Sequence, residues 1–176
     1  MQNWSIEPVI DWLMHKGRQI YDLETLVAAV LEHGGEVLRF IGDASLAVFP
    51  MATDAGREVR RATCVKAVDA AKSARERVRE ANVRRNAAGD APFACGVGLH
   101  LGRVLYGNIG TLTRLELSVI GAAANETARI ESLCKKTGRD VVLSRAVAEA
   151  LDAPWPSLGE FELAGVARPM EVVALP

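Results

Sequence analysis

The sequence predicts an α+β fold in which helices cover a mostly antiparallel sheet. Short β-prone runs come in pairs around tight turns, as at 36–41 and 44–49. Longer stretches with apolar residues at helical spacing lie between these pairs. Because the two patterns mix irregularly and hairpins dominate, we expect antiparallel neighbours rather than the regular alternation of a parallel sheet.

Length and composition indicate one domain with a sizeable core. The chain has 176 residues, of which 49% are hydrophobic, and this excludes a disordered chain. Its formal net charge of −1 argues against bulk attraction to nucleic acid or to an acidic membrane. Cys64, Cys95 and Cys134 form no CxxC pair and are interpreted as small apolar residues of a reducing compartment. With no membrane-length apolar run and no visible signal peptide, we expect a cytoplasmic chain without membrane contact.

The first residues are apolar but fit no clean period. Pro8 is suited to open a short helix over 8–16. We therefore expect an atypical helical segment over 1–30, followed by the main domain over 31–176.

A helix and a hairpin should come next. Leucine and valine recur at spacings of three and four over 22–32, which predicts a helix that Gly34 and Gly35 end. Two β-prone runs then predict strands at 36–41 and 44–49.

Residues 54–88 carry a long helical pattern whose apolar stripe thins towards its end. Its many arginines lie largely off that stripe and alternate with glutamates. We interpret them as a solvated helix face rather than a nucleic-acid site. Gly89, Asp90 and Pro92 break the pattern.

The second half of the chain should add another hairpin and a helix. Residues 93–101 and 103–109 are β-prone and flank Gly102, which predicts a turn there. A further strand is expected at 115–120, and a helix at 122–136.

The tail should close the sheet. A strand at 140–143 leads to a short helix over 144–150, which Ser144 begins as N-cap. Two more strands are expected at 158–163 and 169–175.

The first hairpin turn is the most informative feature of the chain. Gly42 allows a tight backbone turn, and Asp43 then stands at its tip with a free carboxylate. A carboxylate on a rigid hairpin is well placed to hold a hard divalent cation. Taken alone, an ordinary Gly-Asp turn is the simpler explanation.

Two further segments change that interpretation. In Ser-Val-Ile-Gly-Ala-Ala-Ala-Asn-Glu-Thr-Ala-Arg, over 118–129, Asn125 and Arg129 lie one turn apart on the same helix face. A glycine-rich segment over 96–110 comes before it. Together with the hairpin, these segments resemble the class III adenylate and guanylate cyclase catalytic domain, in the family's order and over about residues 31–175.

The resemblance implies a fold and a reaction. The fold would be the nucleotide cyclase fold, which is a ferredoxin-like core with an extra C-terminal subdomain. The enzyme, a phosphorus–oxygen lyase, would use Mg²⁺ or Mn²⁺ to convert ATP or GTP to the 3′,5′-cyclic monophosphate and pyrophosphate. For this chain we expect ATP, cyclic AMP and a role in signal transduction. A head-to-tail homodimer with active sites at the subunit interface is also implied.

The resemblance assigns roles to individual residues. Asp43 matches a metal-binding aspartate, Asn125 the residue that orients the ribose, and Arg129 the arginine that stabilises the transition state. Arg39 and Ser118 match the two purine-reading positions. Arg39 is a departure, since members that prefer ATP carry lysine there, and arginine cannot supply the same compact ammonium.

Two more departures concern the phosphate and metal sites. Arg168 is the one cation near the last strands that could replace a family lysine that contacts phosphates. The family's first strand, with the pattern Phe-x-Asp-Ile-x-x-Phe-Thr and the other metal aspartate, has no match here. Its nearest mimic is Val-Ile-Asp-Trp around Asp11. We therefore expect an N-terminally truncated cyclase fold, with the first residues or a neighbouring subunit filling the gap beside the remaining strands.

Two functions stay open at this point. One is an active nucleotide cyclase. The other is a catalytically impaired domain that acts as a nucleotide-binding, dimerisation or regulatory module. Because half of the metal site is missing, we expect the chain by itself to make little or no cyclic AMP.

Two other families are excluded. In diguanylate cyclases the acidic residue sits directly in a Gly-Gly turn, whereas Asp43 lies at a later turn. An RNA-binding ferredoxin-like module would need exposed aromatic residues on its strands, and aromatic residues make up 5% of the chain.

Overall fold

A computed structural model describes residues 4–6, 9–15, 21–41, 44–52, 54–111 and 114–176. The helices are α1 (Tyr21–Glu32), α2 (Arg57–Ala87), α3 (Ala122–Thr137) and α4 (Arg145–Ala150). The strands are β1 (Trp4–Ile6), β2 (Val9–His15), β3 (Glu36–Ile41), β4 (Ala44–Val48), β5 (Ala94–His100), β6 (Val104–Thr111), β7 (Arg114–Ile120), β8 (Val141–Ser144), β9 (Ser157–Phe161) and β10 (Met170–Ala174).

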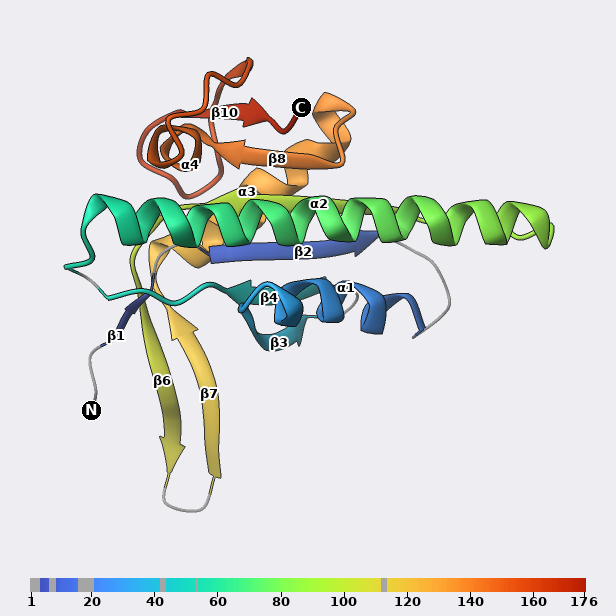
Figure 1. The fold of residues 1–176 in the computed structure, drawn as a ribbon. Coiled ribbons are helices and arrows are strands. Elements are labelled where there is room, and N and C mark those ends of the chain that lie inside the picture. The colour runs from blue at the N-terminus through green and yellow to red at the C-terminus, as the bar shows by residue number, and fades with distance from the viewer. Residues whose placement is uncertain (1–3, 7–8, 16–20, 42–43, 53, 112–113) are drawn as a thin grey trace.

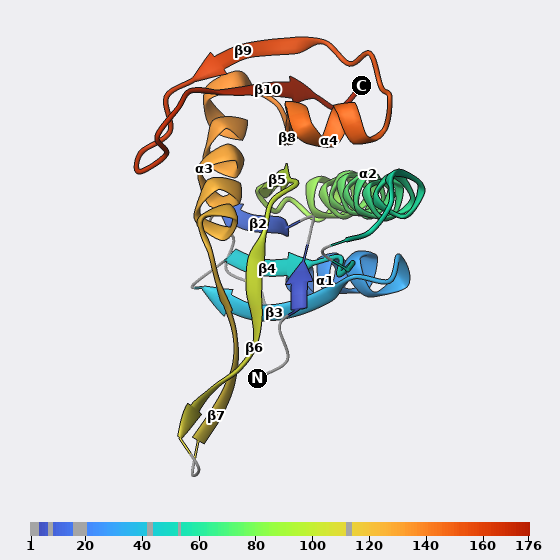
Figure 2. The same cartoon turned by 90° about the vertical axis from the view of Figure 1, so that its left-hand side faces the viewer.

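The main sheet has seven strands in the order β3-β4-β2-β5-β8-β10-β9 (Figures 1 and 2). Its neighbours are antiparallel, apart from the parallel pair β5 and β8. The strands β3, β4, β2 and β5, joined through α1 and α2, give the ferredoxin-like core, and β8 to β10 extend the sheet as the C-terminal subdomain. The predicted α+β class and its mostly antiparallel sheet are confirmed.

Strand β2 corrects the expected N-terminus. We expected a helix over 8–16 and no central strand, whereas β2 lies between β4 and β5, with Asp11 opposite Leu46 and Gly98. Its Val-Ile and Trp-Leu pairs form a nearly continuous apolar run. Such a run is typical of a central strand with both faces covered, which is why it shows no helical period. The core is therefore not truncated at this strand, and the first residues fill the gap.

The segment over 1–30, expected to be helical, is also mixed in structure. Its described part contains β1 and β2 as well as most of α1. Strand β1 pairs with β6, so it belongs to a different sheet from β2.

The second predicted hairpin is wrong. Strands β5 and β6 do not pair with each other: β6 pairs with β1 and β7 in a separate three-stranded sheet. A Cβ atom added to Gly102 would lie 2.4 Å from the Cβ of Ala123, so the chain passes tightly against α3 here instead of turning back along β5. Strands β6 and β7 project from the body as a long arm (Figures 1 and 2).

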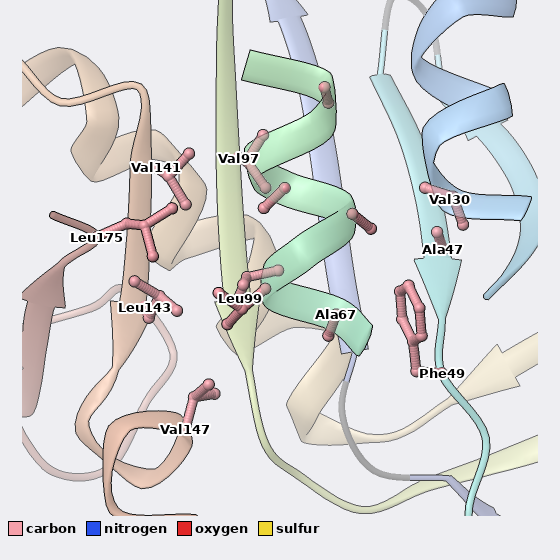
Figure 3. Packing of buried hydrophobic residues seen from close by; sticks show 14 of the residues in the cluster. Val30, Ala47, Phe49, Ala67, Val97, Leu99, Val141, Leu143, Val147 and Leu175 are labelled. Atoms are coloured by element: carbon pink, nitrogen blue, oxygen red, sulfur yellow. The ribbon is translucent and has the colours of Figure 1, made fainter. Parts of the chain in front are cut away.

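Helices cover both faces of the main sheet. On one face, α1 and α2 lie over an apolar cluster that includes Phe49, Val97 and Leu99 (Figure 3). Four buried alanines let α2 approach the sheet closely: Ala67, Ala70, Ala71 and Ala74. On the other face, α3 lies across β5 and β2.

Glycines in β5 allow α3 to lie very close to the sheet. A Cβ atom at Gly98 would stand 2.6 Å from the backbone nitrogen of Glu131, and one at Gly96 would stand 2.3 Å from its Oε1 atom. Since real Cβ atoms do not approach so closely, the Gly-Val-Gly sequence fixes the distance between α3 and β5.

The predicted helix ends are confirmed in part. α1 ends ahead of Gly34, which has a φ of 80°, and α3 ends at Gly138 with a φ of 66°. Ser144 precedes α4 as predicted but makes no capping hydrogen bond. Within the described ranges, no helix is both long and apolar enough to cross a membrane.

Candidate active site on helix α3

Strand β7 leads directly into α3 through Gly121. A Cβ atom at Gly121 would lie 2.9 Å from the carbonyl oxygen of Arg103 and 3.1 Å from the Cα atom of Val104. The residue at this junction therefore has to be small. The helix begins without a side-chain cap and with no acidic residue in its first turn, so its position depends on packing and on the contacts of its first two turns.

Asn125 and Arg129 both lie on the exposed side of α3, one turn apart. Among the described residues, neither side chain has a hydrogen-bond or ion-pair partner. The carbonyl oxygen of Arg129 accepts a 2.6 Å hydrogen bond from the Ser132 hydroxyl. The predicted pairing of these two side chains on one helix face is thus present and open to solvent.

The opposite side of α3 is buried. Ala123, Thr127 and Ile130 are at most 2% exposed. The Thr127 hydroxyl donates a 2.7 Å hydrogen bond to the carbonyl oxygen of Ala123, one turn back. This buried side holds the helix on the sheet, while Asn125 and Arg129 face outward.

His100 and Glu126 form a polar contact between β5 and the start of α3. The Nε2 atom of His100 lies 3.0 Å from an Oε2 atom of Glu126. Burial lowers the pKa of His100, and the carboxylate of Glu126 opposes that shift. His100 is therefore neutral at pH 7 and donates from Nε2 to the carboxylate. Sequence reasoning did not find this contact, because no periodicity links two residues so far apart in the chain.

The predicted metal ligand, Asp43, lies outside the described residues. Its neighbour Ala44 pairs with Leu13, near the carboxyl end of β2. Asp11, the nearest mimic of the family's first aspartate, lies opposite Leu46.

The predicted purine-reading residues can be placed by backbone register. Arg39 lies on β3 opposite Leu46, just after an irregularity in the pairing of β3 with β4. Ser118 lies on β7 opposite Gly107. The structure describes the backbone of Arg39 and Ser118 but not their side chains.

Arg168 lies away from Asn125 within one chain. It is exposed between β9 and β10, beside an open cavity of about 410 Å³. Leu163 and Val166 of the same segment pack with Leu133 in the second half of α3. The structure therefore brings Asn125 and Arg129 together but leaves Arg168 near the other end of that helix.

The donor set of the described residues does not by itself fit a metal ion. Within those residues, no group of three or more histidine, cysteine, aspartate or glutamate side chains is arranged to hold one. The cysteines do not offer an alternative chemistry. All three are buried, and none forms a disulfide bond within the described residues. Burial raises the pKa of Cys95 and Cys134 to about 12, so these two remain protonated at neutral pH.

Curated relatives of this chain are adenylate cyclases. The photoactivated adenylate cyclase subunit alpha of Euglena gracilis is 30% identical over 129 residues, which covers 73% of this chain and 12% of that protein. The adenylate cyclase of Anabaena cylindrica is 29% identical over 126 residues, which covers 72% of this chain and 24% of that protein. The chain thus spans a quarter or less of either relative. No family model matches it.

Solved cyclase structures share the fold over nearly the whole chain. The adenylyl cyclase CyaB from P. aeruginosa superposes with a TM-score of 0.80 at 17% identity, covering 99% of this chain and 95% of that one. The guanylate cyclase domain of RhGC from Catenaria anguillulae, in complex with GTP, gives a TM-score of 0.72 at 18% identity, covering 98% and 96%. Sequence similarity and fold together show that the chain belongs to the class III adenylate and guanylate cyclase catalytic domains, a family of enzymes.

Proposed function

We propose that this domain converts ATP to cyclic AMP and pyrophosphate by attack of the ribose 3′-hydroxyl on the α-phosphate. The observation that carries the proposal is the exposed pair Asn125 and Arg129, one turn apart on α3 and without a polar partner in the described chain. The adenylate cyclase relatives favour ATP over GTP. Because ATP is a cytoplasmic metabolite, we place the domain in the cytoplasm, in a signalling role.

The two side chains suit different parts of the substrate. The Arg129 guanidinium is permanently charged and presents several N–H donors in a fixed fork, which matches phosphoryl oxygens where negative charge develops. The Asn125 amide can both donate to and accept from ribose hydroxyls. Holding the ribose fixes the 3′-hydroxyl near the α-phosphate, which lowers the entropic part of the barrier.

A divalent cation, Mg²⁺ or Mn²⁺, belongs to this proposal. Mg²⁺ sites for nucleotides commonly use one or two carboxylates together with substrate phosphates. Asp43 would supply a carboxylate, and the triphosphate would supply further oxygens. A bound ion would neutralise phosphate charge and lower the pKa of the 3′-hydroxyl.

The proposed assembly is a head-to-tail homodimer in which Asp43 of one protomer faces Asn125 and Arg129 of the other. The β6–β7 arm supports it. Leu105 and Ile120 lie opposite each other at the base of the arm and are 59% and 54% exposed. Apolar side chains so placed on a projecting arm suit contact with a second subunit.

The remaining assignments are also proposals. Arg39 and Ser118 would contact the purine ring. Arg168 would contact the triphosphate, and its distance from Asn125 within one chain is compatible with its acting at a site shared between protomers.

The test is complementation between two inactive variants. Asp43→Asn and Arg129→Ala are each assayed for cyclic AMP formation from ATP with Mn²⁺, and then mixed after unfolding and refolding together. In a head-to-tail dimer, one site of each mixed dimer keeps both wild-type residues. Random assortment should therefore restore about a quarter of the wild-type rate.

Two results would contradict the proposal. Failure of the mixture to regain activity, when each parent chain dimerises normally, rejects the shared site. Cyclic GMP formed from GTP at a higher kcat/KM than cyclic AMP from ATP rejects the substrate. The wild-type chain in the same assay also tests the expectation of slow turnover, and Glu149→Gln, on exposed α4, is the matched control.

A further inference from the structure

The contact between His100 and Glu126 lies at the start of the helix that carries the candidate site. The side chain of His100 is 7% exposed and that of Glu126 is 23% exposed, and their closest atoms are 3.0 Å apart. Glu126 immediately follows Asn125 in the sequence. Any movement of Glu126 relative to β5 therefore moves Asn125 as well.

The first turn of α3 is otherwise held by apolar packing, since Ala123 is buried in a cluster with Val104 and Val119. Gly121 makes no capping hydrogen bond. Ala123 packs against Gly102. This contact between two small residues leaves no room for a larger side chain, but it does not fix the orientation of the helix. Within the described residues, the hydrogen bond from His100 to Glu126 is the one polar side-chain link between the first two turns of α3 and the sheet.

The protonation of His100 is constrained by its second ring nitrogen. Nε2 donates to the carboxylate, so Nδ1 carries no proton in the neutral ring. Nδ1 is buried, and no hydrogen-bond partner for it lies among the described residues. Protonation would place an N–H donor at Nδ1 with nothing to accept it, which carries a desolvation penalty.

We propose that His100 and Glu126 are positioning residues whose hydrogen bond fixes the N-terminal end of α3, and with it Asn125, while His100 is neutral. Acidification breaks this arrangement, because the imidazolium is not accommodated in its buried place. The link to Asn125 rests on the proposed function, whereas the hydrogen bond and its titration do not.

Other ionisable residues lie near this contact. From α3, Glu126 faces the ring and Glu131 packs at Gly98, two residues away along β5. On β2, Val9 pairs with His100, and Asp11 is the ionisable residue two positions along. Strand β8 lies beside Leu99 and has no ionisable residue. Carboxylates ordinarily titrate near pH 4, well below the range of a histidine.

The first experiment follows His100 directly and needs no nucleotide. Nitrogen-15 NMR of the imidazole across pH 5 to 8 should show a proton on Nε2 and a pKa below 6.5 in the wild-type chain. In Glu126→Gln the amide oxygen still accepts from Nε2, but the favourable negative charge is gone, so the pKa should fall further. A proton on Nδ1, or an unchanged pKa in Glu126→Gln, would overturn the proposal.

Hydrogen exchange then tests the positioning of the helix. At pH 7, Glu126→Leu should lose about tenfold in amide protection over 124–129, as expected for loss of one charge-assisted hydrogen bond. Glu126→Gln should retain most of that protection, because it keeps an acceptor. Equal loss in both variants, or none in Glu126→Leu, contradicts a positioning role.

The pH profile of nucleotide binding connects the contact to the site. Binding of Mn²⁺ with α,β-methylene-ATP, measured by calorimetry, should weaken in the wild-type chain as pH falls below about 6.5. The midpoint should move to lower pH in Glu126→Gln and stay in place in the Glu149→Gln control, which corrects for titration of the nucleotide itself. An unmoved midpoint in Glu126→Gln rejects the link to Asn125. Absence of binding at every pH rejects the proposed function instead, while the NMR and exchange results still decide the positioning role.

Discussion

The two faces of the main sheet are held to their helices in different ways. Under α1 and α2, the contact is made by side chains of ordinary size, with Phe49 and Leu99 packed against a row of alanines (Figure 3). Under α3, glycines at 96, 98 and 102 allow the chain to lie in close contact with the backbone and side chains of the helix. On the same face, the buried His100 forms a hydrogen bond with Glu126. The packing under α1 and α2 supplies apolar burial, and the close contacts under α3 fix the position of that helix.

This difference indicates which face contributes most to stability and which face requires an exact helix position. Apolar burial is non-directional and tolerates small shifts of a helix. Close contacts at glycine, and a hydrogen bond with one orientation, do not tolerate such shifts. The face that presents Asn125 and Arg129 is the one built on the stricter contacts.

The largest effect is expected on the α1 and α2 face. Phe49 is 1% exposed and packs against Val30 and Gly35. Phe49→Ala should lower the free energy of unfolding by about 3–5 kcal/mol, since it leaves a cavity in the main cluster. Urea denaturation measures the free energy of unfolding. A loss below about 1 kcal/mol would show that packing under α1 and α2 contributes less to stability than we argue.

A smaller loss, but a more specific one, is expected on the α3 face. In Gly98→Ala the new Cβ atom would stand 2.6 Å from the backbone nitrogen of Glu131, so α3 must move away from β5. We expect a loss of about 1–3 kcal/mol by urea denaturation. Nucleotide binding should also weaken at pH 7 under conditions where the variant is fully folded.

The matched control for that variant is Gly56→Ser, because Gly56 precedes α2 in open space and serine is a good N-cap residue. It should leave stability unchanged or slightly raised. If Gly98→Ala binds nucleotide as the control does, the position of α3 is not as strict as we argue.

A third effect should appear in the pH dependence of stability. Because burial lowers the pKa of His100 in the folded chain, the unfolded chain binds the proton more readily below pH 6.5. Stability should therefore fall as pH drops from about 6.5 towards the lowered pKa, and His100→Phe should remove this slope.

Thermal unfolding between pH 7.5 and 5 measures that slope. Glu171 does not interfere, since the Arg145 guanidinium holds its pKa at about 2, so its contribution is lost at more acid pH. A wild-type slope that persists in His100→Phe would assign the effect to another group.

The smallest effect is expected on the exposed side of α2, towards its carboxyl end. Val83 is 69% exposed there. Val83→Lys should change the free energy of unfolding by less than about 0.5 kcal/mol, again by urea denaturation. A larger loss would indicate a contact of this end with another subunit.

Local signals in the sequence were sufficient for most helices and for the first hairpin. Spacings of three and four predicted α1 and α3, and the Gly-Asp turn predicted strands β3 and β4. The common face of Asn125 and Arg129 followed from their separation by four residues. These features depend on residues close together in the chain.

The features that sequence reasoning missed depend on tertiary contacts. Strand β2 was expected as a helix because its nearly continuous apolar run lacks the alternation that marks a strand with one exposed face. The break at Gly102 was expected as a hairpin because Ala123, which occupies the space there, is distant in sequence. The contact of His100 with Glu126 exists only once α3 lies on β5, while Asp43 lies outside the described residues.

The central place of β2 has a consequence for how the chain folds. Its residues 9–15 pair with 94–100 of β5, so two central neighbours are separated by the whole of α1, β3, β4 and α2. Contacts between such distant segments close a long loop before they contribute any stability, and this slows folding. During synthesis, β2 must wait with one unpaired edge until β5 has left the ribosome, and in that interval the nascent domain is most exposed to aggregation and most in need of chaperones.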